Sequence, residues 1–211
     1  MFSPTFSIDD GHPLDLKVAG ILAKKGYKAI FYIPIKNSEG LLTLNKKQIL
    51  FLSKHFEIGS HTYNHVVLTD LSPKKIEKEI VMGKEALEDI IGKEVTSFCP
   101  PRGKYNQEVL DIAEKLGITD VRSARIVNFH KSVKAGLWHP NLHLYPHPLI
   151  KDLINCLKYL DPLSFSVRLE YRKLKHLELI KVFKKAKFSP HFWLHSWEID
   201  KLGLWNIVNS L

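Results

Sequence analysis

Short apolar segments alternate with helical segments along the first part of the chain, and this alternation most restricts the possible fold. An apolar run at 6–8 precedes a segment with helical spacing at 15–25, and a second apolar run follows at 28–35. A strand, a helix and a second strand within about thirty residues form a βαβ unit, whose two strands are parallel. The alternation continues to residue 123. The sequence therefore predicts an α/β fold with a parallel sheet or barrel.

The remaining elements are predicted from the same signals. Helices are expected at 45–54, 72–91, 106–116 and 151–160, and strands at 56–60, 95–98 and 118–123. Ser72 and Pro73 suit the first two positions of the long helix, and Gly92 suits its end. Beyond residue 126 we expect one strand around 141–145, a basic helix over much of 167–187, a strand at 192–194 and a short amphipathic segment at 201–211.

The composition indicates one ordinary globular domain, residues 1–211, with 45% hydrophobic and 25% charged residues. Transmembrane helices are not expected, because the chain has no apolar run of about 18 residues. Met1 to Asp9 lacks the basic and apolar regions of a secretory signal, and Cys99 and Cys156 fit a reducing compartment. These features predict a cytoplasmic protein.

The net charge of +9 favours an anionic partner in principle. The lysines are spread along the chain and no nucleic-acid-binding motif accompanies them, so we expect a solvated lysine surface and no nucleic-acid partner. His139, His143 and His147 recur every four residues, but the prolines among them prevent a continuous helix. We expect a loop or edge strand near a substrate groove there.

Two adjacent carboxylates, Asp9 and Asp10, directly follow the first predicted strand. Neighbouring side chains at the end of a strand point in different directions, so one can bind a cation while the other accepts a proton. His61 and His65 follow another strand and would face the same way on a helical turn. Together with Asp10 they form a two-histidine, one-carboxylate set, which leaves coordination positions open for water and substrate.

Four motifs, in this order, resemble those of the polysaccharide deacetylases, carbohydrate esterase family four. They are Ser7-Ile8-Asp9-Asp10-Gly11, His61-Thr62-Tyr63-Asn64-His65, Phe98-Cys99-Pro100-Pro101-Arg102-Gly103 and Leu194-His195-Ser196-Trp197-Glu198. The resemblance covers most of the chain, from residue 6 to residue 199. It implies a distorted (β/α) barrel, usually with seven strands, and metal-dependent removal of N- or O-acetyl groups from a carbohydrate.

The resemblance also implies roles for individual residues. Asp10, His61 and His65 would hold the metal, Asp9 would be the general base, and His195 would be the general acid. Zinc suits these ligands, and cobalt, nickel or iron would bind similar ones. The metal and backbone N–H groups of the loop after Pro101 would hold the oxyanion. Candidate supporting residues are Pro101, Arg102, Gly103, Tyr105, Trp138, Leu194 and Trp197.

The chain departs from the family pattern at two places. Cys99 stands where the family has an arginine that contacts the base, and the candidate replacements are Arg102, Arg122 and Arg125. The fourth family motif, Asp-x-x-Asp-Trp, is missing. Another acid, Glu198 or Asp200, would then orient His195, and Trp138 or Trp197 would form the wall of the acetyl pocket.

The expected substrate is an acetylated sugar or glycan, in the form of a lipid-linked or nucleotide-linked sugar. Two alternatives to this function stay open. One is a hydrolase of the same fold that acts on another linear or cyclic amide, because the fourth motif is missing. The other is a catalytically silent protein whose basic surface binds an anionic glycan or a membrane. The sequence makes no prediction about the oligomeric state.

Overall fold

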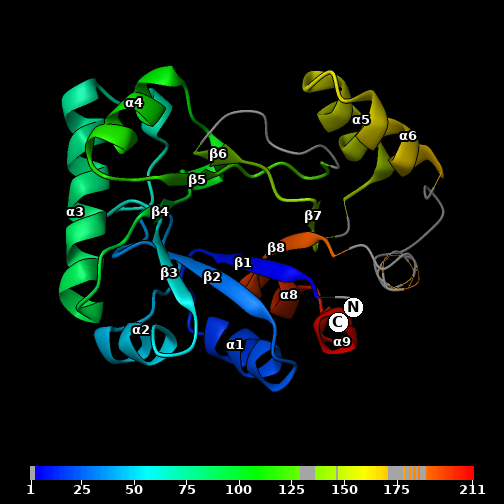
Figure 1. The fold of residues 1–211 in the computed structure, drawn as a ribbon, viewed down its shortest axis with the longest axis horizontal. Helices are drawn as coiled ribbons and strands as arrows, with labels where there is room; N and C mark the ends of the chain where they lie inside the picture. The colour runs from blue at the N-terminus through cyan, green and yellow to red at the C-terminus, as the bar shows by residue number, and fades with distance from the viewer. Residues whose placement is uncertain are drawn as a thin grey trace.

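Eight parallel strands form one curled sheet in the computed structural model, which describes residues 3–128, 136–145 and 147–170, positions 178, 181, 183 and 185, and residues 189–211. The strand order is β6-β5-β4-β3-β2-β1-β8-β7, and every neighbouring pair is parallel. Helices lie outside the sheet (Figure 1). The strands are Thr5–Asp9 (β1), Lys28–Ile33 (β2), Glu57–Ser60 (β3), Ser97–Phe98 (β4), Asp120–Arg122 (β5), Leu137–Trp138 (β6), Leu142–His143 (β7) and His191–His195 (β8).

This architecture confirms the predicted α/β barrel, with eight strands in place of about seven. The additional strand arises in the irregular middle of the chain, where the sequence predicted a single strand. The chain forms β6 there, at one edge of the sheet, and then β7 at the other edge, with only residues 139–141 between them. An antiparallel bridge between Val127 and Leu142 adds to this connection. The two edges of the sheet are therefore joined by a very short link.

The helices at 15–24, 46–52, 73–91, 107–115 and 149–158 begin and end close to the predicted positions, whereas those at 162–170 and 196–201 were not predicted at these positions. The helices are Asp15–Lys24 (α1), Lys46–Leu52 (α2), Pro73–Ile91 (α3), Gln107–Lys115 (α4), Leu149–Lys158 (α5), Pro162–Glu170 (α6), Ser196–Lys201 (α8) and Trp205–Ser210 (α9), with 3-10 turns at Leu68–Asp70 (η1) and Pro101–Gly103 (η2). The side chains of Asn45 and Asn106 accept hydrogen bonds from the first turns of α2 and α4. Most of the predicted basic helix lies outside the described residues. None of the described helices has the length and apolar character needed to span a membrane.

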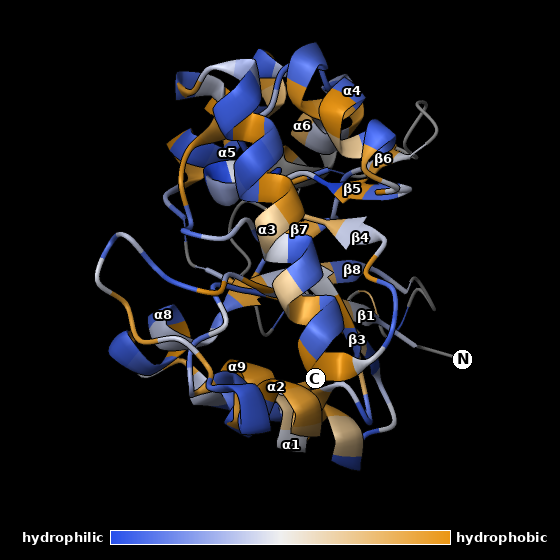
Figure 2. Ribbon diagram, turned by 90° about the vertical axis from the view of Figure 1, so that its left-hand side faces the viewer, coloured by the Kyte–Doolittle hydropathy of each residue, from blue (hydrophilic) through white to orange (hydrophobic). Residues whose placement is uncertain are grey.

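The apolar side chains of the strands and helices form two clusters. The larger one joins β1, β2 and β8 to α1 and α9, and the smaller one lies under α3 and α4. Figure 2 shows hydrophobic and hydrophilic residues alternating along α3, as expected of a helix with one buried face. Ile76, Ile80 and Leu87 form its buried face, and each contributes about 1.5–3 kcal/mol by leaving water.

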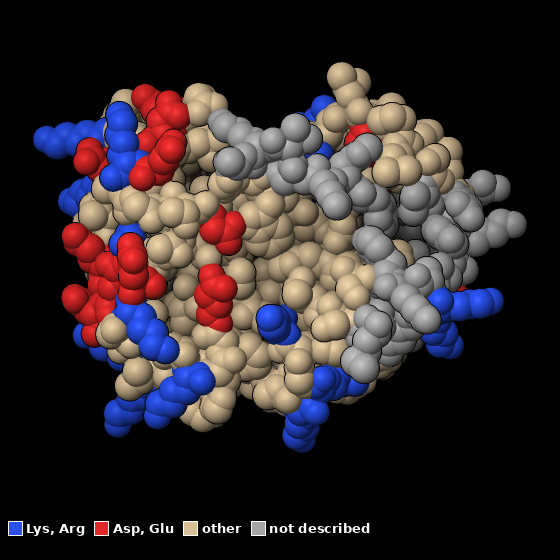
Figure 3. Space-filling model, viewed as in Figure 1, with Lys and Arg blue, Asp and Glu red and all other residues tan. Residues whose placement is uncertain are grey.

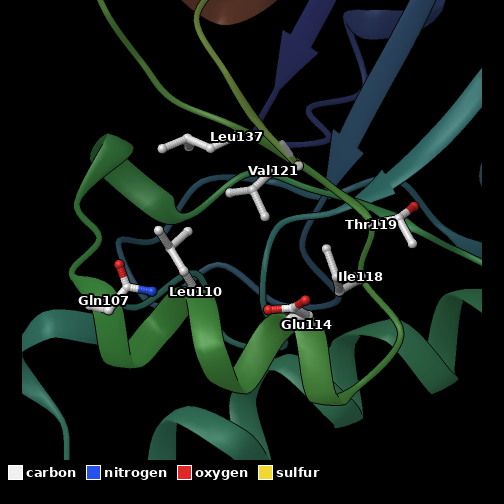
Figure 4. A pocket seen from close by; sticks show the side chains of 8 residues that line it. Gln107, Leu110, Glu114, Ile118, Thr119, Val121 and Leu137 are labelled. Atoms are coloured by element: carbon white, nitrogen blue, oxygen red, sulfur yellow. The ribbon is translucent and has the colours of Figure 1, made fainter. Parts of the chain in front are cut away.

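The sequence motifs lie at the carboxyl ends of the strands. Two hollows lie elsewhere on the molecule. One of about 420 Å³ opens at the beginnings of the strands, between Thr5, Lys28, Glu57 and His191. Figure 3 views this side, with acidic side chains beside a central depression. The other, of about 280 Å³, lies between α4 and the β5–β6 edge, where Leu110, Val121 and Leu137 meet (Figure 4).

Helix α3 presses against the loop that contains His61 and His65, and the contact is made at Gly83. A Cβ atom on Gly83 would lie 2.7 Å from the carbonyl carbon of Thr62 and 2.9 Å from the amide nitrogen of Tyr63. Both atoms belong to backbone, which cannot move as a flexible side chain can. The absence of a side chain at this position therefore sets how closely the helix supports the loop.

We predict that Gly83→Ala destabilises the protein by about 1–3 kcal/mol through this clash. Gly20→Ala is the matched control, because Gly20 lies in α1 and a Cβ atom added there would have no neighbour within 4 Å, so alanine should stabilise by about 0.5–1 kcal/mol. Urea unfolding of both variants measures the difference. Equal stability of the two variants would contradict the close contact.

Candidate active site

Strand β1 delivers the two adjacent carboxylates to the end of the barrel where the strands finish. Asp9 is the last residue of β1, and Asp10 turns the chain sharply with a φ of 75°. Gly11 follows with a φ of 59°, and a Cβ atom there would lie 2.8 Å from Ile33 Cγ2. The turn directs the two buried carboxylates to different partners: Asp9 contacts Arg122, whereas Asp10 contacts the histidines.

His61 and His65 lie in a loop after β3 and not on the helical turn that their spacing suggested. Thr62 and His65 both have positive φ, at 65° and 55°. The loop is held by its backbone: the N–H of Lys36 donates to the carbonyl of Tyr63 at 2.8 Å, and the N–H of Tyr63 donates to the carbonyl of Glu79 at 3.0 Å. The imidazole centroids are nevertheless 5.0 Å apart. Loop geometry, rather than helical periodicity, brings the rings together.

Asp10, His61 and His65 form a buried cluster suited to a metal ion. Asp10 Oδ1 lies 3.5 Å from His61 Nε2 and 3.1 Å from His65 Nε2. One ligand atom from each residue lies within 4.8 Å of the others. The carbonyl of Cys99 is 2.5 Å from His61 Nδ1 and can only accept, so Nδ1 carries a hydrogen and Nε2 faces the carboxylate. A bare Nε2 opposite a carboxylate requires a cation between them, either a metal ion or a proton.

The charges around Asp10 favour its ionised form. Burial alone would raise the pKa of Asp10, but His195, His61 and His65 together hold it well below its usual range. For His61, burial would lower the pKa, yet the contacts with Cys99 and Asp10 raise it well above its usual value. Trp197 Nε1 donates to Asp10 Oδ2 at 2.8 Å, which leaves Oδ1 directed at the two histidines.

Arg122 holds Asp9 from the opposite side of the barrel. Its Nη2 donates to both carboxylate oxygens of Asp9 and lies 3.1 Å from Cys99 Sγ. The arginine is fully buried, and its guanidinium lies 4.9 Å from the ring centroid of Tyr32 and 5.2 Å from that of Trp193. Burial would lower the pKa of Arg122, but Asp9 raises it above its usual value.

The other two candidate arginines have different partners. Arg102 donates to Glu39 Oε1 from both Nε and Nη2, at 3.1 and 3.0 Å, and Arg125 donates to Asn128 Oδ1 at 3.2 Å. Arg122 is therefore the arginine that contacts the proposed base. Glu39 also lies 3.6 Å from His65 Nδ1, a contact that sequence reasoning missed because Glu39 stands in a polar turn.

His195 stands at the end of β8, beside β1. Its Nδ1 lies 2.6 Å from Glu198 Oε2, and its Nε2 lies 3.9 Å from Asp10 Oδ2. Burial would lower the pKa of His195, but Asp10 and Glu198 raise it to about 9. Asp200 instead accepts a hydrogen bond from Trp205 at 2.8 Å. Of the two acids considered for orienting His195, Glu198 is the one in contact.

His143 lies on the edge strand β7, as the sequence analysis allowed, but its contact with Glu198 was not predicted. Its Nε2 lies 3.5 Å from Glu198 Oε2, and its ring stacks on Trp193 with centroids 3.6 Å apart. Burial lowers the pKa of His143 to about 3, so the ring is neutral at physiological pH. The residue belongs to β7, whose pairing with β8 brings it beside Glu198. Its four-residue spacing from two other histidines carried no information about this contact.

The supporting residues are divided between the two ends of the barrel. The ring centroids of Trp138 and His191, at the start of β8, are 4.5 Å apart. Those of Trp197 and His195, at the end of β8, are 5.7 Å apart. The sheet register explains this, because Trp138 pairs with Arg122 on an edge strand and packs away from the carboxylates. Trp197 is thus the tryptophan beside the cluster. Leu194 is buried in the core, and Tyr105 packs against the smaller apolar cluster.

The Pro101–Gly103 turn supplies backbone groups. Arg102 has a φ of 56°, and the N–H of Gly103 donates to the carbonyl of Pro100 at 2.9 Å. Gly103 is required here, because a Cβ atom would lie 2.5 Å from Ala124 Cβ.

Comparison with known proteins relates the sequence and the fold of this chain to one family. The sequence profile of the family Polysaccharide deacetylase matches residues 4–121, more than half of the chain. The chain belongs to the polysaccharide deacetylase family. The peptidoglycan-N-acetylglucosamine deacetylase of Bacillus cereus is 29% identical over 109 residues, which cover 52% of this chain and 44% of that protein. Chitin deacetylase 1 of Cryptococcus neoformans is 29% identical over 119 residues, covering 54% of this chain and 24% of that protein.

A solved structure extends the likeness to the whole chain. The family 4 carbohydrate esterase from Streptomyces lividans, in complex with acetate, has a TM-score of 0.61 at 14% identity and covers 100% of this chain and 88% of its own. At that identity the likeness establishes the fold. The first curated relatives are matched over only 40%, 30% and 24% of their own lengths.

We predict that Arg122→Met destabilises the protein by about 3–5 kcal/mol, because it leaves the buried carboxylate of Asp9 without its partner. Arg102→Met removes an exposed ion pair with Glu39 and should change the stability by less than about 1 kcal/mol. Urea unfolding of both variants provides the comparison. A similar decrease in the free energy of unfolding in the two variants would show that the Asp9–Arg122 contact does not stabilise the protein as predicted.

Proposed function

We propose that this chain, residues 1–211, is a metal-dependent carbohydrate deacetylase that hydrolyses N-acetyl or O-acetyl groups. The observation that carries the proposal is the convergence of Asp10, His61 and His65 on one point, beside Asp9 and His195. Family membership supports the reaction class. Zinc is the proposed metal, since two imidazoles and a carboxylate form a typical zinc donor set, and cobalt, nickel or iron would bind similar ligands.

A divalent cation held by Asp10, His61 and His65 would polarise the acetyl carbonyl and lower the pKa of a bound water toward about 7. Asp9 accepts the proton of the attacking water. Its two oxygens are fixed by Arg122, and each oxygen keeps a lone pair that is not used in that contact.

His195 donates a proton to the leaving nitrogen or oxygen. Glu198 accepts a hydrogen bond from Nδ1, so Nε2 is the atom directed at the site. The backbone N–H of Arg102 follows Pro101 and would donate to the oxyanion that forms as the carbonyl is attacked. Trp197 borders the space beside His195 and is the proposed wall of the acetyl pocket.

A hydrolase of the same fold acting on another linear or cyclic amide is the alternative within the enzyme class, because the family's fourth motif is missing. Glu198 takes over the contact with His195, which favours retained activity over a silent binding protein. Release of acetate from an acetylated sugar distinguishes these possibilities.

We predict that the metal-loaded protein releases acetate from N-acetylated sugars and that Asp9→Asn lowers kcat by about 10²–10⁴-fold, since asparagine cannot accept the proton. Removal of the metal by a chelator should abolish activity, and added zinc should restore it. Asp89→Asn, on the exposed face of α3, is the control and should keep full activity. Full activity of Asp9→Asn would refute the role of Asp9 as the base.

We further predict that Trp197→Phe lowers zinc affinity by about 10–100-fold, because Asp10 loses the hydrogen bond that orients its carboxylate. Competition with a chromophoric chelator measures this affinity independently of activity. Trp205→Phe is the matched control, since its indole donates to Asp200 at the same distance of 2.8 Å but outside the cluster. Equal zinc affinities of the two variants would contradict a positioning role for Trp197.

A further inference from the structure

A hollow of about 510 Å³ lies between the loop that carries His61 and His65 and the first half of α3. Lys36, Lys75 and Lys78 line it, together with Tyr63 and Glu79. We call it the lysine hollow. It is distinct from the cluster of Asp10 and the two histidines, none of which lines it.

The lysine hollow and the proposed metal site share one loop, residues 61–65. Tyr63 stands between the two histidine ligands in sequence and contributes to the wall of the hollow. The backbone N–H of Lys36 donates to the carbonyl of Tyr63 at 2.8 Å, which fixes the segment that follows β2 to this loop. A group bound in the lysine hollow is therefore held against the outer side of the same loop that positions His61 and His65.

The charges in the lysine hollow are not balanced. Among the described residues, the amino groups of Lys36, Lys75 and Lys78 form no ion pair with any carboxylate. The acid in the hollow, Glu79, accepts hydrogen bonds from Asn64 at both oxygens, from the backbone N–H at 2.9 Å and from Nδ2 at 2.7 Å. Three exposed lysines thus surround one concave surface, and Glu79, the acid among its lining residues, has both oxygens bonded to Asn64.

The aromatic ring of Tyr63 adds a second feature suited to a sugar ligand. Lys36 Nζ lies 5.5 Å from the centroid of this ring, so a cation and an aromatic face are presented together. A concave basic surface concentrates anions by its electrostatic field. An aromatic face offers a flat apolar contact of the kind found in small-molecule sites.

We propose that the lysine hollow binds an anionic group, a phosphate or a carboxylate, carried by the acetylated sugar whose acetyl group is hydrolysed at the neighbouring metal site. This inference rests on the proposed deacetylase function, and it predicts a preference for negatively charged sugars over neutral ones. The lysines contribute to binding of the substrate and take no part in the chemical step, so they affect KM rather than kcat.

The test compares acetate release from neutral N-acetylglucosamine with release from N-acetylglucosamine 1-phosphate and from N-acetylmuramic acid. The triple variant Lys36→Gln, Lys75→Gln, Lys78→Gln removes the cations of the hollow. The matched control is Lys25→Gln, Lys54→Gln, Lys93→Gln, which removes the same charge from exposed positions that precede β2, β3 and β4, at the other end of the barrel.

We expect the triple variant to raise KM for the charged sugars by about tenfold, with kcat unchanged and with no effect on the neutral sugar. The two charged sugars distinguish phosphate from carboxylate as the bound group. The control should match the wild type. Equal effects on charged and neutral sugars, or equal effects of the two triple variants, would overturn the proposal.

Binding is measured separately by ligand-observed NMR with N-acetylglucosamine 1-phosphate, on the wild type and both triple variants. One outcome is that the phosphorylated sugar binds the wild type, binds the hollow variant about tenfold more weakly, and yet loses no acetate. This result would refute the proposed reaction but support binding of the anionic group in the lysine hollow. Equal affinity of all three proteins for the phosphorylated sugar would refute binding in the lysine hollow, whether or not acetate is released.

Discussion

The buried ion pair between Arg122 and Asp9 is the interaction on which the proposed active site depends. Arg122 belongs to β5 and Asp9 to β1, and three strands lie between them in the sheet. The guanidinium reaches the carboxylate only because the sheet curls, so that its side chain crosses the interior of the barrel. Burying two charges is costly, and the pair is tolerated because both carboxylate oxygens are bonded and the guanidinium also donates to the carbonyl of Ser123 at 3.0 Å.

Cys99 connects this ion pair to the proposed metal site. Its carbonyl lies 2.5 Å from His61 Nδ1 and fixes the orientation of that imidazole, while its sulfur lies 3.1 Å from Arg122 Nη2. The family pattern has an arginine at this position, and that arginine contacts the base. In this chain a small side chain leaves room for Arg122 to approach from the neighbouring strand, so the same contact is made from a different place in the sequence.

Local patterns predicted most of the fold, and the ordered motifs predicted the candidate site residues. The alternation of apolar runs and helical spacing located the strands and helices because both depend on neighbouring residues. Contacts that depend on the curled sheet were beyond that reasoning. The choice of Arg122 over Arg102 and Arg125, the contact of His143 with Glu198 and the separation of Trp138 from Trp197 all follow from which strands are neighbours. The loop conformation of His61 and His65 also escaped it, because their spacing imitates a helical turn.

In the proposed site, Asp10, His61 and His65 hold a catalytic metal ion while Arg122 holds Asp9 beside it. A crystal structure of the zinc-loaded protein, with anomalous diffraction recorded at the zinc edge, tests this most directly. We expect a single zinc peak, with the ion bound by Asp10 Oδ1 and the Nε2 atoms of both histidines, and with Asp9 still paired to Arg122 and not bound to the metal. A zinc ion among His143, His195 and Glu198, or no peak at the Asp10 cluster, would contradict the proposed site.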